Sequence, residues 1–305
     1  MKFIDIPNVA SIRRLIYGST SALILAILPL HHNAIAQTDT VNTKYEISVF
    51  DVPGASLTYL LDVTNKGVVV GAYEDGSGHH GFVLGRSGLQ NVDFPGASYT
   101  DVIGINSRGD LVGDYIDSSG NQQGFHSVGG TLQPFNYPGS VAGFPRSINN
   151  RGDIAGGFVD SAGVSHGYSM IDGNFAQIDF PTAIYTDAFS INDSREIVGF
   201  YTLADGSNHG FVLVDGTFET IDIPGANQIL LTRNNDAGTI VGDYKDGTSH
   251  VTHGFLWKDG KVSIIDGPAS SFTRLRGVNG HEMIVGWFVD GAGVTHGLKA
   301  RRRDD

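Results

Sequence analysis

The feature of this sequence that most constrains its fold is a unit that recurs six times at a nearly constant period. Each copy contains a turn whose commonest form is Asp-x-Pro-Gly. The prolines of these turns are Pro53, Pro95, Pro138, Pro181, Pro224 and Pro268, so that 42 to 44 residues separate neighbouring copies. Eleven residues after each proline stands an asparagine, or Thr64 in the first copy. A period of this length is typical of solenoids, propellers and other repeat arrays.

Each copy divides into four short segments with strand character, separated by turns. In the second copy these segments are residues 99–106, 110–117, 123–128 and 132–137. Glycine-containing turns such as Asn106-Ser-Arg-Gly109 separate them, and no helical periodicity of useful length follows residue 36. Four strands per 40–50 residues is typical of one blade of a β-propeller. The sequence therefore predicts an all-β, six-bladed β-propeller with about 43 residues in each blade.

The two ends of the repeat region predict how the ring closes. The region opens with Tyr45–Phe50, which has the character of a fourth strand, and it stops after a third strand near residues 296–302. We expect residues 44–52 to pair with this last strand, because closing the ring in this way removes two unpaired edges. The predicted propeller spans residues 44–303, with repeat units beginning near residues 53, 95, 138, 181, 224 and 268.

The first 36 residues have the pattern of a signal peptide. Lys2, Arg13 and Arg14 precede a mostly apolar stretch, and Ala34-Ile-Ala36 is a small-x-small cleavage signature. The apolar stretch is interrupted and short for a membrane span, which disfavours an uncleaved anchor. We expect cleavage after Ala36, a linker at 37–43, and a mature protein in the periplasm or outside the cell with no membrane attachment.

Charge and cysteine content exclude several classes of function. Removing residues 1–36, with three basic residues and one acid, changes the net charge from −12 to −14. Such a chain repels phosphate backbones, so we expect no nucleic-acid partner. The chain has 42 glycines but no cysteine, which excludes disulfides and cysteine-based zinc sites.

We also expect the glycine at the centre of each second strand, as in Leu111-Val-Gly113, to let the neighbouring blade approach closely.

A known repeat family shares part of this pattern. The segment at 191–211, and nearly so those at 105–125 and 235–255, follows Ile-Asn-x-x-Gly-x-Ile-Val-Gly and ends in His-Gly-Phe. This pattern resembles the HAF-repeat family of bacterial extracellular proteins, although His209-Gly210-Phe211 has glycine where the family name has alanine. The resemblance covers about residues 50–300. It implies export and a β-propeller-like fold, but it implies no established activity.

Repeated histidines and acidic turns favour a structural role over metal binding. Five copies carry a histidine before the glycine of the third strand: His80, His166, His209, His253 and His296. We expect each to bind the backbone of its own or the next blade. The Asp-x-x-Gly loops offer one carboxylate each, whereas calcium requires six to eight oxygens. We therefore predict neither a metal site nor a cofactor. No nucleophile signature is present, so the sequence assigns no catalytic residue.

Positions that differ between the copies are the better candidates for a ligand site, because packing alone would keep the copies alike. The residues six and eight positions after each proline vary strongly and flank the first strand, which we expect to be innermost. The candidate ligand-binding residues taken from this region are Tyr59, Asp101, Phe144, Arg146, Asp187, Arg233, Arg274 and Arg276. At the channel mouth they would combine charges with aromatic platforms, which suits a carbohydrate or a small anion. Scattered surface charge on loops is the alternative.

Three functions remain open from the sequence. The leading prediction is a secreted or periplasmic propeller that binds a carbohydrate, a small anionic molecule or a protein partner. The first alternative is a hydrolase or lyase acting on a polysaccharide, with Asp101, Asp187, Arg146 and Arg274 as first candidates for its polar residues. The second alternative is a structural component of the cell surface.

Overall fold

The computed structural model describes residues 32–33 and 44–303, and every regular element within them is a β-strand. Most of the predicted signal peptide and linker therefore lies outside the described residues. In the described part, no helix is long and apolar enough to cross a membrane.

The strands pair antiparallel in four-stranded units that follow the sequence repeat. The first two units are β3 (Leu57–Val63), β4 (Val69–Asp75), β5 (Gly78–Gly85) and β6 (Gly88–Val92), then β7 (Tyr99–Ile105), β8 (Leu111–Ile116), β9 (Gln122–Val128) and β10 (Thr131–Pro134). The next two are β11 (Ala142–Ile148), β12 (Ile154–Val159), β13 (Ser165–Ile171) and β14 (Asn174–Ile178), then β15 (Tyr185–Ile191), β16 (Ile197–Thr202), β17 (Asn208–Val214) and β18 (Thr217–Asp222). β19 (Ala226–Asn234), β20 (Ile240–Asp246), β21 (Thr252–Lys258) and β22 (Lys261–Ile264) follow. The predicted all-β fold of four-stranded units is confirmed.

The last unit is completed by a strand from the start of the described region. β23 (Ser270–Val278), β24 (Ile284–Asp290) and β25 (Thr295–Arg302) pair in order, and β2 (Tyr45–Phe50) adds antiparallel to β25. Tyr45 is opposite Arg302 and Phe50 is opposite Gly297, which is the pairing that the sequence predicts. Outside the repeats, β1 (His32–Asn33) pairs with β18.

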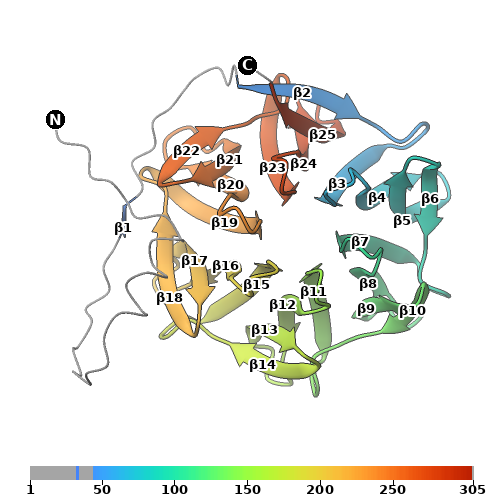
Figure 1. Ribbon diagram of the computed structural model, residues 1–305, viewed down its shortest axis with the longest axis horizontal. Helices are drawn as coiled ribbons and strands as arrows, with labels where there is room; N and C mark the ends of the chain where they lie inside the picture. Colours follow the sequence, from blue (N-terminus) through green and yellow to red (C-terminus); the bar gives the residue numbers. More distant parts are fainter. Residues whose placement is uncertain (1–31, 34–43, 304–305) are drawn as a thin grey trace.

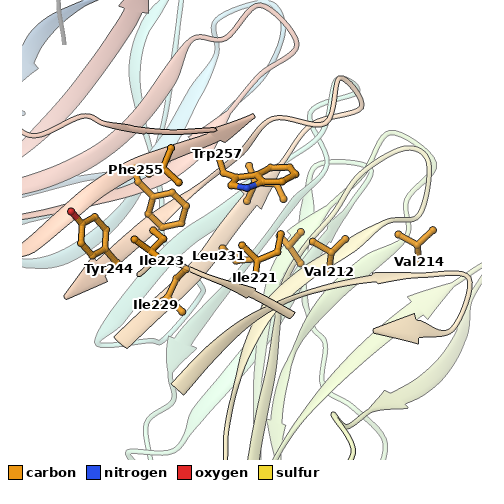
Figure 2. Packing of buried hydrophobic residues seen from close by; sticks show 12 residues of the cluster. Val212, Val214, Ile221, Ile223, Ile229, Leu231, Tyr244, Phe255 and Trp257 are labelled. Carbon is orange, nitrogen blue, oxygen red and sulfur yellow. The ribbon is translucent and has the colours of Figure 1, made fainter. Parts of the chain in front are cut away.

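Figure 1 shows the units standing around a common centre, with the first strand of each unit innermost. The faces of neighbouring units pack against each other and bury most of the core. At the seam between the β15–β18 and β19–β22 units, for example, the buried cluster contains Val212, Ile221, Leu231, Phe255 and Trp257 (Figure 2). Burying a large apolar side chain contributes about 1.5–3 kcal/mol, so these seams are the main source of stability.

Glycines in the centres of the second and third strands make this packing feasible. The prediction that the second-strand glycine lets the neighbouring unit approach is wrong. A Cβ at Gly113, in the centre of a second strand, would overlap the Asp101 carbonyl oxygen of its own unit. It is the third-strand glycine that faces the next unit. A Cβ at Gly210 would lie 2.8 Å from Leu231 Cγ.

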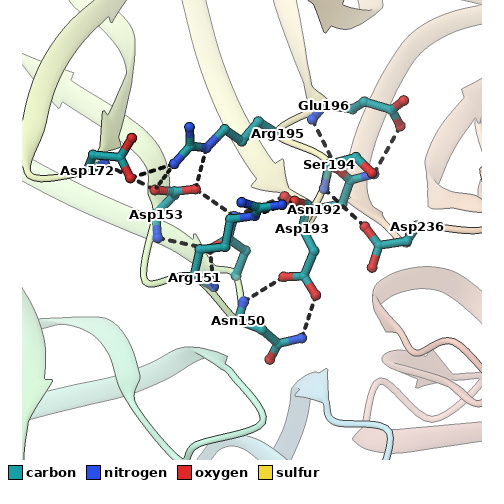
Figure 3. Close-up of polar contacts among 11 residues, drawn as sticks. Asn150, Arg151, Asp153, Asp172, Asn192, Asp193, Ser194, Arg195, Glu196 and Asp236 are labelled. Carbon is teal, nitrogen blue, oxygen red and sulfur yellow. Dashed lines mark hydrogen bonds and ion pairs between the residues drawn. The ribbon is translucent and has the colours of Figure 1, made fainter. Parts of the chain in front are cut away.

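The repeated asparagines form a belt that joins the units at one end of the channel. The Asn106 side chain donates to the Asn149 carbonyl at 3.2 Å, and Asn149 donates to the Asn192 carbonyl at 3.0 Å. The series ends where Asn279 donates to the Thr64 carbonyl at 3.0 Å. Figure 3 shows a second tier beside this belt, in which Asn150 binds the Asp193 carboxylate. The belt asparagines are thus structural residues.

The repeated histidines are also structural, but their main partner differs from the predicted backbone group. Four of the five pair through Nδ1 with the aspartate thirteen residues later, which begins the turn that leads to the next unit, and the last histidine pairs in the same way with the aspartate that begins the first turn. His209 Nδ1 lies 3.0 Å from Asp222, and His296 Nδ1 lies 2.8 Å from Asp51 on the opposite end of the chain. The second copy replaces both members, and Asn136 donates to Gln123 at 2.7 Å. The histidine therefore clamps the connection that leads to the next unit.

Replacing His296 by glutamine should remove a pH-dependent part of the stability. The hydrogen bond to Asp51 raises the pKa of His296, with Asp290 as a second carboxylate 3.5 Å away. A raised folded-state pKa means that the stabilisation is complete below the unfolded pKa of about 6.5 and is lost as the pH rises through the folded value. The difference in melting temperature between wild type and His296→Gln should thus shrink from pH 5 to pH 9. The exposed His281 provides the control substitution, and a pH-independent difference would contradict the clamp.

Candidate functional site

A β-bulge in every first strand shapes the centre of the molecule. In each unit the pairing register between the first and second strands shifts by one residue, at the position eight residues after the proline. An extra residue in a bulge is left out of the ladder, which re-aims its side chain. The bulge residues are Leu61, Ile103, Arg146, Phe189, Thr232 and Arg276.

Ring contacts show that three of these bulge residues, Arg146, Phe189 and Arg276, meet at the centre of the molecule. The Arg276 guanidinium carbon lies 5.0 Å from the ring centre of Phe189, although the whole β19–β22 unit separates their strands. Arg146 approaches the same ring at 5.0 Å. The guanidinium groups of Arg146 and Arg276 therefore both contact the ring of Phe189, and they come from two different units.

Three of the residues six positions after a proline, Tyr59, Asp187 and Arg274, meet the second strand of the preceding unit at the seam between units. Tyr59 lies edge-on to Trp287 with ring centres 5.0 Å apart. The Asp187 carboxylate would lie 2.7 Å from a Cβ at Gly157. Arg274 Nε is 2.7 Å from Asp243 Oδ1, and Nη2 donates to Oδ2 at 3.2 Å.

Of the arginines Arg146, Arg274 and Arg276 at the centre, the first two have a carboxylate partner. Arg146 Nη2 lies 3.3 Å from Asp187 Oδ2, and Arg274 pairs with Asp243. Asp187 is only 2 % exposed, and burial raises its pKa despite this partner. One of the two carboxylates considered for an enzyme is therefore committed to an internal ion pair.

Arg276 is the third arginine, and it has no carboxylate partner within the described residues. Within the described residues, no carboxylate lies within ion-pair distance of its side chain. Burial, together with the positive charges of Arg274 and Arg146, lowers the pKa of Arg276 to about 9. Nearby, Arg146 Nε is buried without a hydrogen-bond partner in the described part of the chain. We call Arg146, Arg274 and Arg276 the arginine cluster; within the described residues, Arg276 is the member that has no ion-pair partner.

A second polar group lies on the β7 side of the channel. Asp101 accepts a hydrogen bond from the Tyr99 hydroxyl at 2.7 Å, and His79 Nε2 lies 2.7 Å from its other oxygen. Burial and the charge of Asp101 raise the pKa of Asp114 to about 6. This group connects to the arginine cluster through electrostatics, since Arg146 lowers the pKa of Asp114.

Arg233 makes contacts across the channel. Its Nη2 donates to the Ile103 carbonyl at 3.1 Å and lies 3.3 Å from Asp62 Oδ2, both on the far side of the channel. A cavity of about 440 Å³ opens at the asparagine belt, and its lining includes Asp62 and Arg233. Arg233 thus links units on opposite sides of the channel and lines this cavity.

The structure therefore brings Arg146, Asp187, Arg274 and Arg276 together and places Phe144 beside them, 5.2 Å from the Arg146 guanidinium carbon. Tyr59 contacts the cluster indirectly, because its ring packs against Trp287 and the Arg274 guanidinium carbon lies 5.7 Å from the Trp287 ring centre. Asp101 belongs instead to the polar group on the β7 side. Arg233 forms the contacts across the channel. Sequence reasoning missed the second-strand partners. The residue after each second-strand glycine varies between copies in the same way, as Ala72, Asp114, Gly157, Phe200, Asp243 and Trp287, and this variation is the signal that could have found them.

Comparison with known proteins shows the fold and no family. No family model matches the chain, and no curated protein matches it in sequence. Among solved structures, a putative TolB from Agrobacterium tumefaciens aligns with a TM-score of 0.55 and 16% identity, over 86% of this chain and 98% of that one. The Aleuria aurantia lectin bound to α-methyl-L-fucoside aligns with a TM-score of 0.51 and 10% identity, over 83% and 93%. At these identities the likeness establishes the fold alone: the chain has the architecture of β-propeller proteins.

Proposed function

We propose that this chain is an exported six-bladed β-propeller of the HAF-repeat type that binds a carbohydrate carrying an anionic group. The unpaired guanidinium of Arg276 is the observation that carries the proposal. Its charge is disfavoured by burial and by two neighbouring arginines, and a carboxylate or sulfate would relieve both costs.

Three further features support this proposal. The strand units described above fit the blade count of six, and the pattern at residues 1–36 fits export. Aromatic rings lie around the arginine cluster, including Phe144, Phe189 and Trp287, and such rings provide apolar faces for sugar rings. The lectin from Aleuria aurantia is a protein of similar architecture whose structure holds a fucoside.

Replacing Arg276 by glutamine should reduce binding of an acidic sugar by about tenfold to a hundredfold. A hydrogen bond to a charged group contributes about 1.5–3 kcal/mol, and 1.4 kcal/mol corresponds to a factor of ten. The mature protein would be screened on a glycan array, and the affinity for the acidic glycans it retains would be measured by calorimetry. Arg86→Gln, on an exposed residue, removes the same charge and should have no effect.

Two results would contradict the proposal. One is equal affinity of wild type and Arg276→Gln for every acidic glycan. The other is a preference of the wild-type protein for neutral counterparts of the same sugars.

A further inference from the structure

One seam between units contains a cavity near the arginine cluster. It lies between the β15–β18 and β19–β22 units and has a volume of about 430 Å³. Its lining includes Tyr185, Phe200, Asn208, Asn227, Gln228 and Lys245. A second cavity of about 480 Å³ continues from it and shares Asn208, Asn227 and Gln228 with it. We call the two together the seam groove.

The backbone at this seam is arranged differently from that at three others. Between β5 and β7, β21 and β23, and β25 and β3, a parallel backbone bridge joins the third strand to the next first strand. In the described residues β17 and β19 form no such bridge. Instead the Asn208 side-chain oxygen accepts a hydrogen bond from the Ile229 amide at 2.9 Å. This contact uses the side-chain oxygen of Asn208, so its amide nitrogen can act as a donor to a ligand in the two cavities that Asn208 lines.

A second local irregularity places polar side chains on the other wall. β19 begins two residues after its proline, whereas β15 begins four residues after its own, and the extension contains an additional bulge between Ala226 and Gln228. The extra residue is Asn227, and both Asn227 and Gln228 are exposed. Bulges next to binding sites commonly re-aim side chains in this way.

The lining has the chemistry that recognises sugar hydroxyls. Each carboxamide both donates and accepts hydrogen bonds, as a sugar hydroxyl does. The rings of Tyr185 and Phe200 stack with centres 5.2 Å apart at an interplanar angle of 23°, and they form an apolar wall. Lys245 adds a cation that has no ion-pair partner within the described residues.

The aromatic wall also connects the groove to the arginine cluster. Phe200 lies 5.8 Å from Phe189, the ring that Arg276 approaches at 5.0 Å. We infer that the seam groove binds a linear oligosaccharide of several residues, whose acidic sugar lies at Arg276 and whose chain runs outward between the two units. This inference rests on the proposed function and adds a direction and a minimum length to its ligand.

The inference can be tested by the dependence of affinity on chain length. Linear oligomers of galacturonic, mannuronic and glucuronic acid with one, two, four and six residues would be titrated against the mature protein. For a series that binds, we expect affinity to rise by about tenfold or more between the monomer and the tetramer. The Asn227→Ala/Gln228→Ala variant should lose this gain and keep the affinity for the monomer. Gln90→Ala/Gln133→Ala removes two exposed amides elsewhere and should keep the gain.

The outcomes separate the groove from the arginine cluster. If affinity does not rise with length, or if the groove variant keeps the full gain, the groove is overturned, while loss of monomer binding in Arg276→Gln still supports the proposed function. If Arg276→Gln keeps full affinity for the oligomers, the placement of the acidic sugar at Arg276 is overturned together with the proposed function. Failure of every oligomer to bind overturns the groove as a site for these acidic oligosaccharides, while the proposed function is still decided by the glycan array and by Arg276→Gln.

Discussion

Deleting residues 1–51, and with them β2, should lower the melting temperature by about 10 °C or more relative to a chain that begins at residue 44. β2 supplies the outer strand of the last unit, and its side chains belong to two buried clusters. Tyr45 packs with Leu298 and Ala300, while Phe50 packs with Leu60 and Phe82. Losing two or three such side chains costs about 4–6 kcal/mol, and each kcal/mol corresponds to about 2–4 °C for a domain of this size.

The comparison with the chain that begins at residue 44 isolates the strand. Both proteins lack residues 1–43, so any difference in thermal unfolding, followed by circular dichroism, comes from residues 44–51. Asp51 also leaves with the deletion, which removes the partner of His296. Equal melting temperatures would show that β2 does not hold the ring closed.

The repeat made the architecture predictable because packing constraints are the same in every copy. The strand positions and the β2–β25 pairing followed from where the asparagine, glycine and aromatic positions recur. The partners of recurring residues were harder to predict. The His296–Asp51 contact joins residues 245 positions apart, and only the ring geometry brings them together. The role of Gly113 was mistaken because a period shows where a glycine recurs but not which strand it contacts, and here that strand belongs to its own unit.

The candidate site was predictable in composition but not in arrangement. Copy-to-copy variation identified Arg146, Arg274 and Arg276, yet it could not show that Asp187 and Asp243 would neutralise the first two. Whether a first-strand residue faces the axis or a seam depends on the bulge. Arg233 shows the same limit, because its partners lie in units that are distant in the sequence.

Replacing Arg233 by methionine should destabilise the protein by about 3–5 kcal/mol at neutral pH. The substitution leaves Asp62, which is 6 % exposed, without its cation, and it removes the hydrogen bond to the Ile103 carbonyl. Breaking a buried ion pair by removing one partner costs this much because an uncompensated charge stays inside. Urea unfolding would measure the change, and Arg86→Met on the surface is the control.

The pH dependence and a second substitution distinguish the lost charge pair from lost packing. Burial raises the pKa of Asp62, and Arg233 opposes that shift, so the methionine variant should raise the pKa further. A carboxyl whose folded-state pKa is raised destabilises the protein above its unfolded pKa and ceases to do so when acid protonates it. The deficit of Arg233→Met should therefore be smaller at pH 4.5 than at pH 7.5. Asp62→Asn in the same chain should recover part of the loss at pH 7.5, because the asparagine side chain carries no charge. If the double variant is no more stable than Arg233→Met, the cross-channel residue contributes through packing and not through its charge.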